Sequence, residues 1–254
     1  MTVADARFTG KAALLTGAAS GIGRAVALRL AGEGAHVFAF DIDAKGLEET
    51  RRLASEAGAS LQFLEGDVSD PAQCRGAVHD CVNAFGRLDV LGNIAGIARA
   101  EHFVDVPEEQ YRRMMGVNVD GYVWMCQAAI PHLLETGGNI VNIASNAGLM
   151  GQAYTVVYCM TKGAVVQLTR SLAMEYVKTP LRVNALAPGG IETNLSASFQ
   201  IPADVDFGLM ARYTGFRAMG HPDDVAALFA LVASDEGANI HGAILSTDAG
   251  ITAG

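Results

Sequence analysis

The sequence predicts an α/β fold in which a doubly wound, seven-stranded parallel sheet carries helices on both faces. Short apolar runs alternate with helical patterns along the whole chain, which is typical of parallel sheets. Half of the 254 residues are hydrophobic, as expected when the strands are buried on both faces. This length suffices for one large α/β domain, so we expect residues 1–254 to form a single domain.

Seven short apolar runs bounded by Gly, Asp or Asn are predicted as strands: Ala12–Thr16, His36–Asp41, Leu61–Glu65, Leu88–Asn93, Asn139–Ala144, Arg182–Ala187 and Ala243–Ser246. Six segments between them have helical patterns: Ile22–Glu33, Ala44–Ala57, Pro71–Phe85, Pro107–Leu134, Ala153–Val177 and Pro222–Val232. Several begin with proline or follow a capping residue, as at Asp70-Pro71, which marks a helix start. We expect Asp43 and Asp70 to cap their helices.

Residues 189–220 lack clear periodicity and contain no clear strand. Their apolar side chains are Leu195, Phe199, Ile201, Phe207, Leu209, Met210, Tyr213 and Phe216. An apolar insert after the sixth strand indicates a lid or substrate loop. The alternative is a pair of short packed helices without ligand contact.

Composition excludes several classes of protein. The net charge of −9 arises from 18 basic and 27 acidic residues, and no basic run suggests a nucleic-acid partner. Polar residues interrupt the long uncharged stretches, so we expect no membrane span, and residues 1–7 lack the pattern of a secretory signal. The four cysteines form no Cys-x-x-Cys and the six histidines show no metal-binding spacing. We therefore expect a cytoplasmic protein with reduced, buried cysteines and no metal.

The turn after the first strand indicates a dinucleotide site and thus a Rossmann-like sheet. Thr16-Gly17-Ala-Ala-Ser20-Gly21-Ile22-Gly23 joins that strand to a helix. Glycines let the backbone approach a pyrophosphate, and the helix start offers free N–H groups and a positive dipole end. Gly17, Ser20, Gly21, Ile22 and Gly23 are therefore predicted to bind the cofactor.

Asp41, at the end of the second strand, predicts NAD rather than NADP. A carboxylate there accepts hydrogen bonds from ribose hydroxyls and repels a 2′-phosphate. Two unit charges about 4 Å apart interact by about 4 kcal/mol at an effective dielectric constant of 20. Ser20 supplies no offsetting cation, and we expect Arg24 to face solvent.

Two later strand ends are predicted to contact the same cofactor. Asp67 and Val68, after the third strand, are placed beside the adenine ring. Asn93, Ala95 and Gly96 close the fourth strand, where small residues permit close approach.

Tyr158 and Lys162 lie four residues apart in a helical segment, so they share one helix face. A nearby ammonium favours the phenolate, so we expect Lys162 to lower the pKa of Tyr158. Ser145 lies 13 residues before Tyr158, after the fifth strand. The alternative for Ser145 is a turn cap without a catalytic role.

These motifs, in this order from Lys11 to Gly250, resemble the short-chain dehydrogenase/reductase family. The resemblance implies that Asn118, Ser145, Tyr158 and Lys162 form the catalytic set, with Tyr158 as general acid and base and Asn118 holding a water toward Lys162. It also implies that Pro188, Gly189, Ile191 and Thr193 lie against the nicotinamide. Two departures from the family pattern are Ile94, where a second Asn is usual, and Thr247-Asp248-Ala249-Gly250 near the C-terminus.

The implied activity is NAD-dependent hydride transfer between the cofactor and a secondary alcohol or ketone, with an apolar substrate favoured by the 189–220 insert. An NADPH-dependent 3-ketoacyl reductase is the alternative, and a non-enzymatic NAD-sensing module is a further one. The resemblance also implies a homotetramer formed through the segments Pro107–Leu134 and Ala153–Val177.

Overall fold

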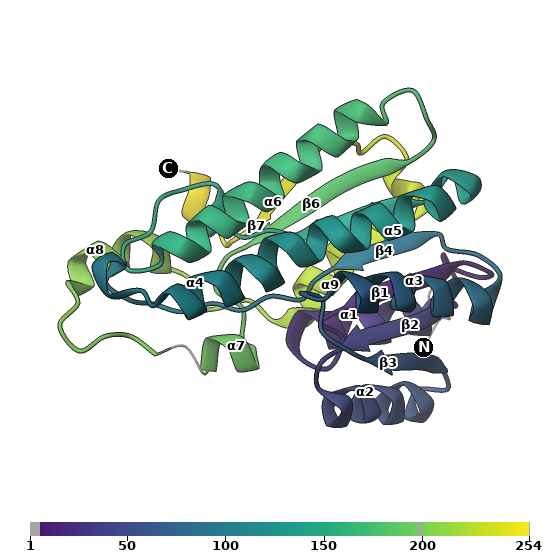
Figure 1. The fold of residues 1–254 in the computed structure, drawn as a ribbon, viewed down its shortest axis with the longest axis horizontal. Coiled ribbons are helices and arrows are strands. Elements are labelled where there is room, and N and C mark those ends of the chain that lie inside the picture. Colours follow the sequence, from purple (N-terminus) through teal and green to yellow (C-terminus); the bar gives the residue numbers. More distant parts are fainter. Residues whose placement is uncertain (1–5, 198–199, 254) are drawn as a thin grey trace.

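Seven strands form one sheet in the order β3-β2-β1-β4-β5-β6-β7, and every neighbouring pair is parallel (Figure 1). The computed structural model describes residues 6–197 and 200–253. The strands are β1 (Ala12–Thr16), β2 (His36–Asp41), β3 (Leu61–Glu65), β4 (Val90–Asn93), β5 (Asn139–Ile143), β6 (Arg182–Pro188) and β7 (Ile244–Thr247). The predicted fold class is confirmed, with strand ends displaced by at most two residues.

Helices cover both faces of the sheet (Figure 1). One face carries α1 (Gly21–Gly32), α2 (Ala44–Glu56) and α9 (Pro222–Ala233), and the other carries α3 (Pro71–Phe85), α5 (Gly121–Thr136) and α6 (Val156–Glu175). Short 3-10 turns occupy Phe103–Asp105, Asn146–Gly148, Asp235–Gly237 and Ile251–Ala253. The predicted caps are confirmed: Asp43 accepts from the Gly46 N–H, and Asp70 accepts from the N–H groups of Ala72 and Gln73.

The segment predicted as one helix over Pro107–Leu134 is divided in the structure. α4 (Glu108–Met115) and α5 are joined by a π-helical turn over Gly116–Asp120, which contains Asn118. The apolar residues in the sequence keep a helical spacing through this turn. One wider turn does not change that spacing noticeably, so the sequence pattern could not reveal it. π-helical turns inside helices are rare and frequent at functional sites.

The insert at 189–220 contains α7 (Asn194–Ala197), α8 (Phe207–Thr214) and a single bridge between Ile191 and Gly220. In secondary structure it therefore matches the alternative of two short helices. Phe199 lies outside the described residues, as do residues 1–5. Figure 1 shows α7 and α8 at one end of the molecule, beyond the sheet.

The chain reverses direction across the sheet between β1 and β4. From β1 it winds outward to β3, then crosses back to β4 and continues to β7. Loops after β1 and β4 therefore lead away from each other and leave a crevice at the carboxyl ends of the strands. In open parallel sheets this switch point is where ligands bind.

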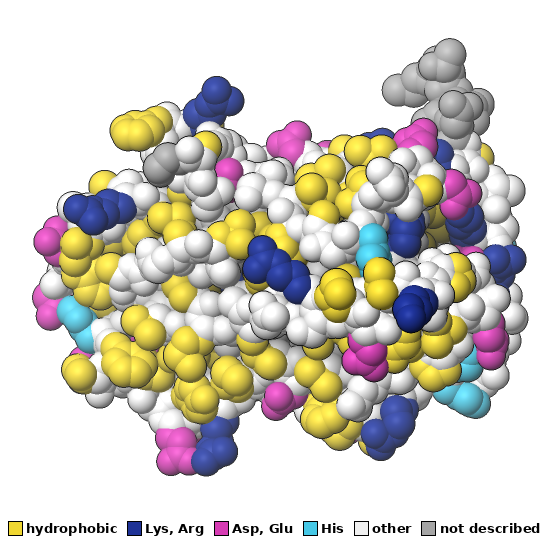
Figure 2. All heavy atoms as spheres, turned by 90° about the horizontal axis from the view of Figure 1, so that it is seen from above, with side chains coloured by type: hydrophobic (Ala, Val, Ile, Leu, Met, Phe, Trp, Pro, Cys, Tyr) yellow, Lys and Arg dark blue, Asp and Glu magenta, His cyan; other side chains and the backbone are white. Residues whose placement is uncertain are grey.

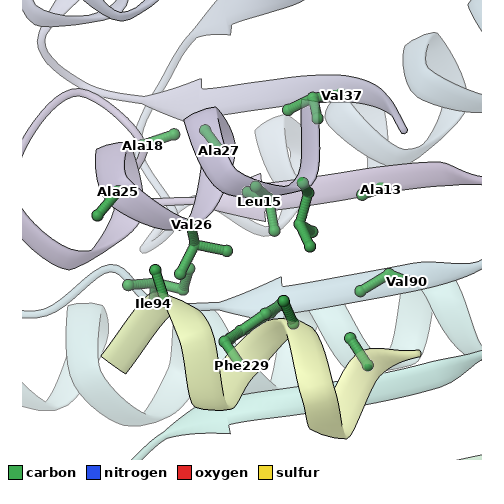
Figure 3. Close-up of a cluster of buried hydrophobic side chains, with 14 of the residues drawn as sticks. Ala13, Leu15, Ala18, Ala25, Val26, Ala27, Val37, Val90, Ile94 and Phe229 are labelled. Atoms are coloured by element: carbon green, nitrogen blue, oxygen red, sulfur yellow. The ribbon is translucent and has the colours of Figure 1, made fainter. Parts of the chain in front are cut away.

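Ile94 follows β4 and packs into the core between the sheet and helices α1 and α9. Its side chain is buried in one cluster with Leu15, Val26 and Phe229 (Figure 3). This replacement of the family's usual asparagine thus adds apolar packing where a polar side chain would need a partner.

Membrane spans, metal sites and disulfides were not expected, and the described residues can be examined for each. Over 6–197 and 200–253, no helix combines the length and apolarity that a bilayer crossing requires. The same residues contain no group of three or more His, Cys, Asp or Glu placed to hold a metal. All four cysteines are unpaired, and Cys159 is half-buried rather than buried as predicted.

Candidate active site

A cavity of about 660 Å³ lies at the carboxyl ends of the strands, within the size range of ligand sites. It joins the glycine turn, the predicted catalytic residues and the 189–220 insert. The predicted residues that line it are Gly17, Ser20, Gly21, Ile22, Gly23, Asp41, Asp67, Val68, Ala95, Gly96, Ser145, Tyr158, Lys162, Pro188, Gly189, Ile191 and Thr193.

Two glycines of the turn have no room for a side chain. Gly17 has a φ of +68°, and a Cβ there would lie 2.8 Å from the Ala95 backbone. A Cβ on Gly23 would collide with the Gly17 carbonyl oxygen. Thr16 ties the two strand ends together, because its Oγ1 accepts hydrogen bonds from the N–H groups of Ile94 at 2.9 Å and Ala95 at 3.1 Å. The turn is thus packed closely enough for a ligand to meet backbone rather than side chains.

The start of α1 fits an anionic ligand. Ser20 is the N-cap of this 12-residue helix, yet its side chain makes no capping hydrogen bond. The first N–H groups of a helix have no partner within the helix, and the dipole places positive charge there. Gly21, Ile22 and Gly23 line the cavity at this point, so the turn suits the pyrophosphate of a dinucleotide.

Asp41 and Arg24 define the charge beside the turn. The Asp41 carboxylate lines the cavity and accepts hydrogen bonds from the N–H groups of Ala19 at 2.9 Å and Asp43 at 3.0 Å. The solvent position predicted for Arg24 is wrong: its guanidinium donates to Thr50 Oγ1 at 3.0 Å and to the carbonyl oxygens of Ala19 and Gly46. Arg24 is therefore held by α2 and the turn.

Asp67 is held by neighbours that sequence reasoning missed. Its carboxylate accepts from Ser69 Oγ at 2.7 Å and pairs with the Arg113 guanidinium at 2.7 Å. Burial acts to raise the pKa of Asp67, but the Ser69 hydrogen bonds and Arg113 together hold it below its usual range. Val68 is buried beside Asp67, in contact distance of Gly121 at the start of α5.

Asn93 was predicted to contact the cofactor, and it is not among the residues that line the cavity. Its fully buried amide Nδ2 donates to Asn142 Oδ1 on β5 at 2.9 Å. Asn142 Nδ2 in turn donates to Thr169 Oγ1 on α6, also at 2.9 Å. Side chains alternate between the two faces of a strand, and Asn93 points into the core between β4, β5 and α6 rather than into the cavity.

Ser145, Tyr158 and Lys162 meet at the centre of the cavity. Ser145 follows β5, while Tyr158 and Lys162 lie one turn apart on α6. The Ser145 hydroxyl hydrogen-bonds to Tyr158 and so acts to lower its pKa. Ser145 Oγ also accepts from the Ala147 N–H at 3.1 Å and caps the 3-10 turn. The turn-cap alternative for Ser145 is therefore real and coexists with its place beside Tyr158.

Lys162 is nearly inaccessible, with 3% of its surface exposed. Its Nζ donates to the Ile143 carbonyl oxygen at 2.7 Å and lies 5.8 Å from the Tyr158 ring centroid. Tyr122, which is also buried, donates to the same carbonyl oxygen at 3.0 Å, and its ring centroid lies 5.4 Å from Nζ. Sequence reasoning missed Tyr122, because a tyrosine on an apolar helix gives no sign of what its hydroxyl contacts.

The expected lowering of the Tyr158 pKa is not found in this structure. Burial raises the pKa of Tyr158 to about 12, and the Ser145 hydrogen bond offsets this only in part. Burial also lowers the pKa of Lys162 to about 7, so the cation itself is destabilised. The proximity of Lys162 is confirmed, but burial rather than Lys162 dominates the pKa of the phenol.

Asn118 lies in the π-helical turn and does not line the cavity. Its Oδ1 accepts from the Ile97 N–H at 2.9 Å, and its Nδ2 donates to the Ile97 carbonyl at 2.8 Å and to Thr161 Oγ1 at 3.1 Å. These bonds tie the segment after β4 to α6. A Cβ on Gly96 would lie 3.4 Å from Asn118 and 3.5 Å from Lys162 Nζ, so the two residues flank one glycine.

The segment after β6 reaches back to the glycine turn. A Cβ on Gly21 would lie 3.1 Å from the Thr193 side chain, and one on Gly189 would lie 2.9 Å from Asp248 Cα. The second departure from the family pattern, at 247–250, thus packs directly against Gly189.

Comparison with known proteins supports the same assignment. A family model described as enoyl-(acyl carrier protein) reductase matches residues 17–252. Meso-2,3-butanediol dehydrogenase from Serratia marcescens is 35% identical over 97% of this chain and 96% of the relative. The chain belongs to the short-chain dehydrogenase/reductase family.

Solved structures agree. A short-chain dehydrogenase from Mycobacterium paratuberculosis bound to NAD has a TM-score of 0.90 and 32% identity, covering 98% of this chain and 100% of that one. A short-chain dehydrogenase from Burkholderia cenocepacia J2315 in complex with NADP has a TM-score of 0.87 and 34% identity, covering 96% and 99%. The predicted class, an oxidoreductase acting between secondary alcohols and ketones with a nicotinamide nucleotide, is confirmed.

The short-chain dehydrogenase site contains further residues that sequence reasoning missed. Arg113, Asn146 and Gln152 are among the polar ones, and all three line the cavity. They come from α4 and from the segment between β5 and α6, and only the tertiary fold brings them together. The 189–220 insert adds apolar lining through Leu195, Ile201, Met210, Tyr213 and Met219.

Proposed function

We propose that this short-chain dehydrogenase/reductase uses NAD in preference to NADP. The observation that carries the proposal is the Asp41 carboxylate, which lines the nucleotide end of the cavity, while Arg24 beside the glycine turn is bonded to Thr50 and two backbone carbonyls. A 2′-phosphate would meet negative charge there, whereas ribose hydroxyls would meet an acceptor. One similar solved structure is bound to NAD and another is in complex with NADP, so family membership does not set the preference. The preference must therefore come from this chain's own residues.

Four residues would perform the chemistry. When bound, a nicotinamide nucleotide supplies the hydride chemistry. Tyr158 Oη exchanges a proton with the substrate oxygen, and Ser145 Oγ donates to that oxygen and stabilises negative charge on it. The Lys162 amine lies 5.8 Å from the Tyr158 ring centroid and is held there by the Ile143 carbonyl oxygen. Asn118 positions the site through its hydrogen bonds to Ile97 and Thr161. It would also hold a water molecule toward Lys162.

The ionisation of Tyr158 distinguishes the two reaction directions. A phenol with a pKa of about 12 is protonated at neutral pH, so it is ready to donate to a ketone oxygen. Oxidation of an alcohol needs the phenolate, which forms more readily as pH rises. At neutral pH the phenol is therefore already in the form that donates to a ketone oxygen, whereas the oxidation step requires its prior deprotonation.

The test compares kcat/KM for NAD and NADP with one alcohol, measured by absorbance of the reduced nucleotide. We expect NAD to be preferred by at least tenfold. A preference for NADP would reject the proposal and favour the 3-ketoacyl reductase alternative. Dinucleotide binding without turnover of any alcohol or ketone would favour the NAD-sensing module.

The 189–220 insert is proposed as the substrate loop of a single dinucleotide-binding domain spanning 1–254. Support comes from Ile201, Met210 and Tyr213, which line the same cavity as the catalytic residues. Two hydroxyl contacts anchor the insert to the segment before α6: Tyr213 Oη donates to the Ala153 carbonyl at 2.8 Å, and Tyr154 Oη accepts from the Asp206 N–H at 2.8 Å. Its apolar lining suits a substrate with a hydrocarbon frame.

A homotetramer is proposed for the assembly, built through α5 and α6. Figure 2 looks down on the α6 side of the molecule and shows hydrophobic side chains gathered there, with isolated charges between them. Met160 and Met174 on α6 are 48% and 70% exposed, and a Cβ on Gly163 would meet open space. Light scattering tests this, and a monomer at micromolar concentration would reject it. A cytoplasmic location is proposed as well, supported by the four unpaired cysteines.

A further inference from the structure

We propose that Tyr122 is a positioning residue for the catalytic amine of Lys162. Its hydroxyl shares the Ile143 carbonyl oxygen with that amine, so Tyr122 sets how firmly the oxygen holds the amine and its proton. This inference rests on the proposed function, because it concerns the amine beside the proton-exchanging Tyr158.

Tyr122 and Lys162 reach the same oxygen from different helices. Tyr122 extends from α5 and is 1% exposed, and its Oη donates to the Ile143 carbonyl oxygen at 3.0 Å. Lys162 extends from α6, and its Nζ donates to that oxygen at 2.7 Å. Burial holds the pKa of Tyr122 well above its ordinary value, so its hydroxyl keeps the proton that it donates.

Sharing the oxygen weakens its hold on a protonated amine. A carbonyl oxygen has two lone pairs and can accept both hydrogen bonds. The two donors, however, bring their positive hydrogens to one atom, so each donor reduces the attraction that the other receives. The loss is greater for a protonated amine than for a neutral one, because a charged donor gains more from its acceptor. The Tyr122 hydroxyl therefore disfavours the protonated form of Lys162.

Few other groups act on the charge of Lys162. Among the residues that the structure describes, no carboxylate forms an ion pair with it, and burial lowers its pKa to about 7. The titratable groups that face the amine are two phenols, since Nζ lies 5.4 Å from the ring centroid of Tyr122 and 5.8 Å from that of Tyr158. Cys126 on α5 and Cys159 on α6 act on these phenols. The shared carbonyl is thus the polar contact through which a neighbour can adjust the amine.

The charge on Lys162 matters when Tyr158 gives its proton to a ketone oxygen and becomes a phenolate. A cation close by favours the phenolate. The Tyr122 hydroxyl thus acts on the reacting phenol through two intermediates, the Ile143 carbonyl and the Lys162 amine. Tyr122 itself does not line the cavity, so its role is positioning rather than catalytic.

A purely structural role is the alternative for Tyr122, since a buried tyrosine hydroxyl usually needs a partner. In a structural role, removal of the hydroxyl would change stability and leave the titration of Lys162 where it was. In a positioning role, the same removal would raise the pH at which Lys162 loses its proton. Tyr122→Phe separates the two roles, because it keeps the ring and leaves the Ile143 carbonyl bonded to Lys162.

The experiment titrates Lys162 directly in the full-length enzyme. The chain has four lysines, and Lys162 is the buried one. Lysine labelled with carbon-13 at Cε therefore gives a simple NMR spectrum, in which the Lys162 signal is the one absent from Lys162→Met. Followed from pH 6 to pH 10, this signal should titrate at least half a pH unit higher in Tyr122→Phe than in the wild type.

The matched control is Tyr176→Phe, which also removes one tyrosine hydroxyl. Tyr176 is partly buried at the end of α6 and does not line the cavity, so this variant should keep the wild-type titration of Lys162. A second readout is the rate of cyclohexanone reduction with NADH. Its decline with rising pH should begin at a higher pH in Tyr122→Phe, while KM for NADH stays nearly unchanged.

The outcomes separate this inference from the proposed function. An unchanged or lowered titration of Lys162 in folded Tyr122→Phe, or an equal rise in Tyr176→Phe, would overturn the positioning role. The oxidoreductase assignment would then stand, because the NMR titration needs no substrate. A raised titration in a protein that turns over no alcohol or ketone with either nucleotide would overturn the proposed function, and with it the role of Tyr122 in catalysis.

Discussion

Tyr122 and Lys162 donate hydrogen bonds to one acceptor, the carbonyl oxygen of Ile143, at 3.0 and 2.7 Å. The acceptor is the last residue of β5, so the sheet fixes the position of the catalytic ammonium. Both side chains are almost completely buried. Strand and helix packing therefore fix the position of the Lys162 amine, 5.8 Å from the Tyr158 ring centroid.

Replacing Lys162 with Met should stabilise the protein in a pH-dependent way. The pKa of Lys162 is about 7 in the folded protein against 10.5 ordinarily, so the unfolded chain binds more protons between these values. Wild-type stability then rises with pH over that range, by about 1.4 kcal/mol per unit, while this contribution is absent from the variant. The stability advantage of Lys162→Met should thus be largest near pH 7 and shrink toward pH 10.

Denaturant unfolding of both proteins at pH 7 and pH 9.5 measures this difference. The lost hydrogen bond to Ile143 lowers the stability of the variant equally at both values, so it leaves the trend unchanged. A stability difference that is constant across this range would show that Lys162 keeps an ordinary pKa.

Tyr158→Phe should lower kcat at least a hundredfold while nucleotide affinity stays within about threefold. The change removes only the hydroxyl that exchanges the proton, and general acid–base groups typically contribute about 10²–10⁴-fold. Steady-state rates and calorimetric titration with NAD check the two parts. Tyr111→Phe is the matched control, since Tyr111 lies on α4 and does not line the main cavity. Retained turnover in Tyr158→Phe would remove the general acid–base role.

The two reaction directions should respond to pH with opposite signs. With a Tyr158 pKa raised to about 12, the phenolate needed for alcohol oxidation becomes more abundant as pH rises from 7 to 9.5. We expect kcat for oxidation to increase over this range and kcat for ketone reduction to stay level or fall. A profile of initial rates in both directions measures this, and a falling oxidation rate would contradict it.

Asp41→Asn should shift the nucleotide preference toward NADP by at least tenfold in kcat/KM. The change removes a negative charge that interacts with a 2′-phosphate by about 4 kcal/mol at 4 Å and an effective dielectric constant of 20. Asp43→Asn makes the same charge change two residues away, outside the cavity lining, and asparagine still caps α2. An equal shift in both variants would assign the effect to overall charge rather than to Asp41.

Gly23→Ala and Gly76→Ala should have opposite effects on stability. A Cβ at position 23 collides with the Gly17 carbonyl, and we expect a loss of about 1–3 kcal/mol, as is typical of overpacking, together with weaker NAD binding. A Cβ at position 76 on α3 meets open space, so alanine there should stabilise by about 0.5–1 kcal/mol. Thermal unfolding and NAD titration of both variants would test this pair.

The sheet and the motif-bearing residues were predictable from local patterns. Alternating apolar runs and helical segments located all seven strands. The glycine turn consists of residues that are adjacent in the chain, so its spacing can be read directly from the sequence. Tyr158 and Lys162 were predictable as neighbours because four residues make about one helical turn.

Features that depend on packing were not predictable. Asn93 belongs to the same strand end as Ala95 and Gly96, but the alternation of side chains turns it into the core. Arg24 looks like a surface cation until α2 supplies its acceptors. The raised pKa of Tyr158 reflects how completely the phenol is desolvated, a quantity that no sequence spacing reports.

The polar chain from Asn93 through Asn142 to Thr169 has a consequence for catalytic alignment. It crosses two strands and ends on α6, two helical turns beyond Lys162. Apolar packing alone would let a helix slide along a sheet, whereas directional hydrogen bonds allow only one register of the helix on the sheet. These three side chains fix the position of α6 along the sheet. The proton-transferring residues on α6 therefore keep their place relative to the glycine turn while substrates enter and leave.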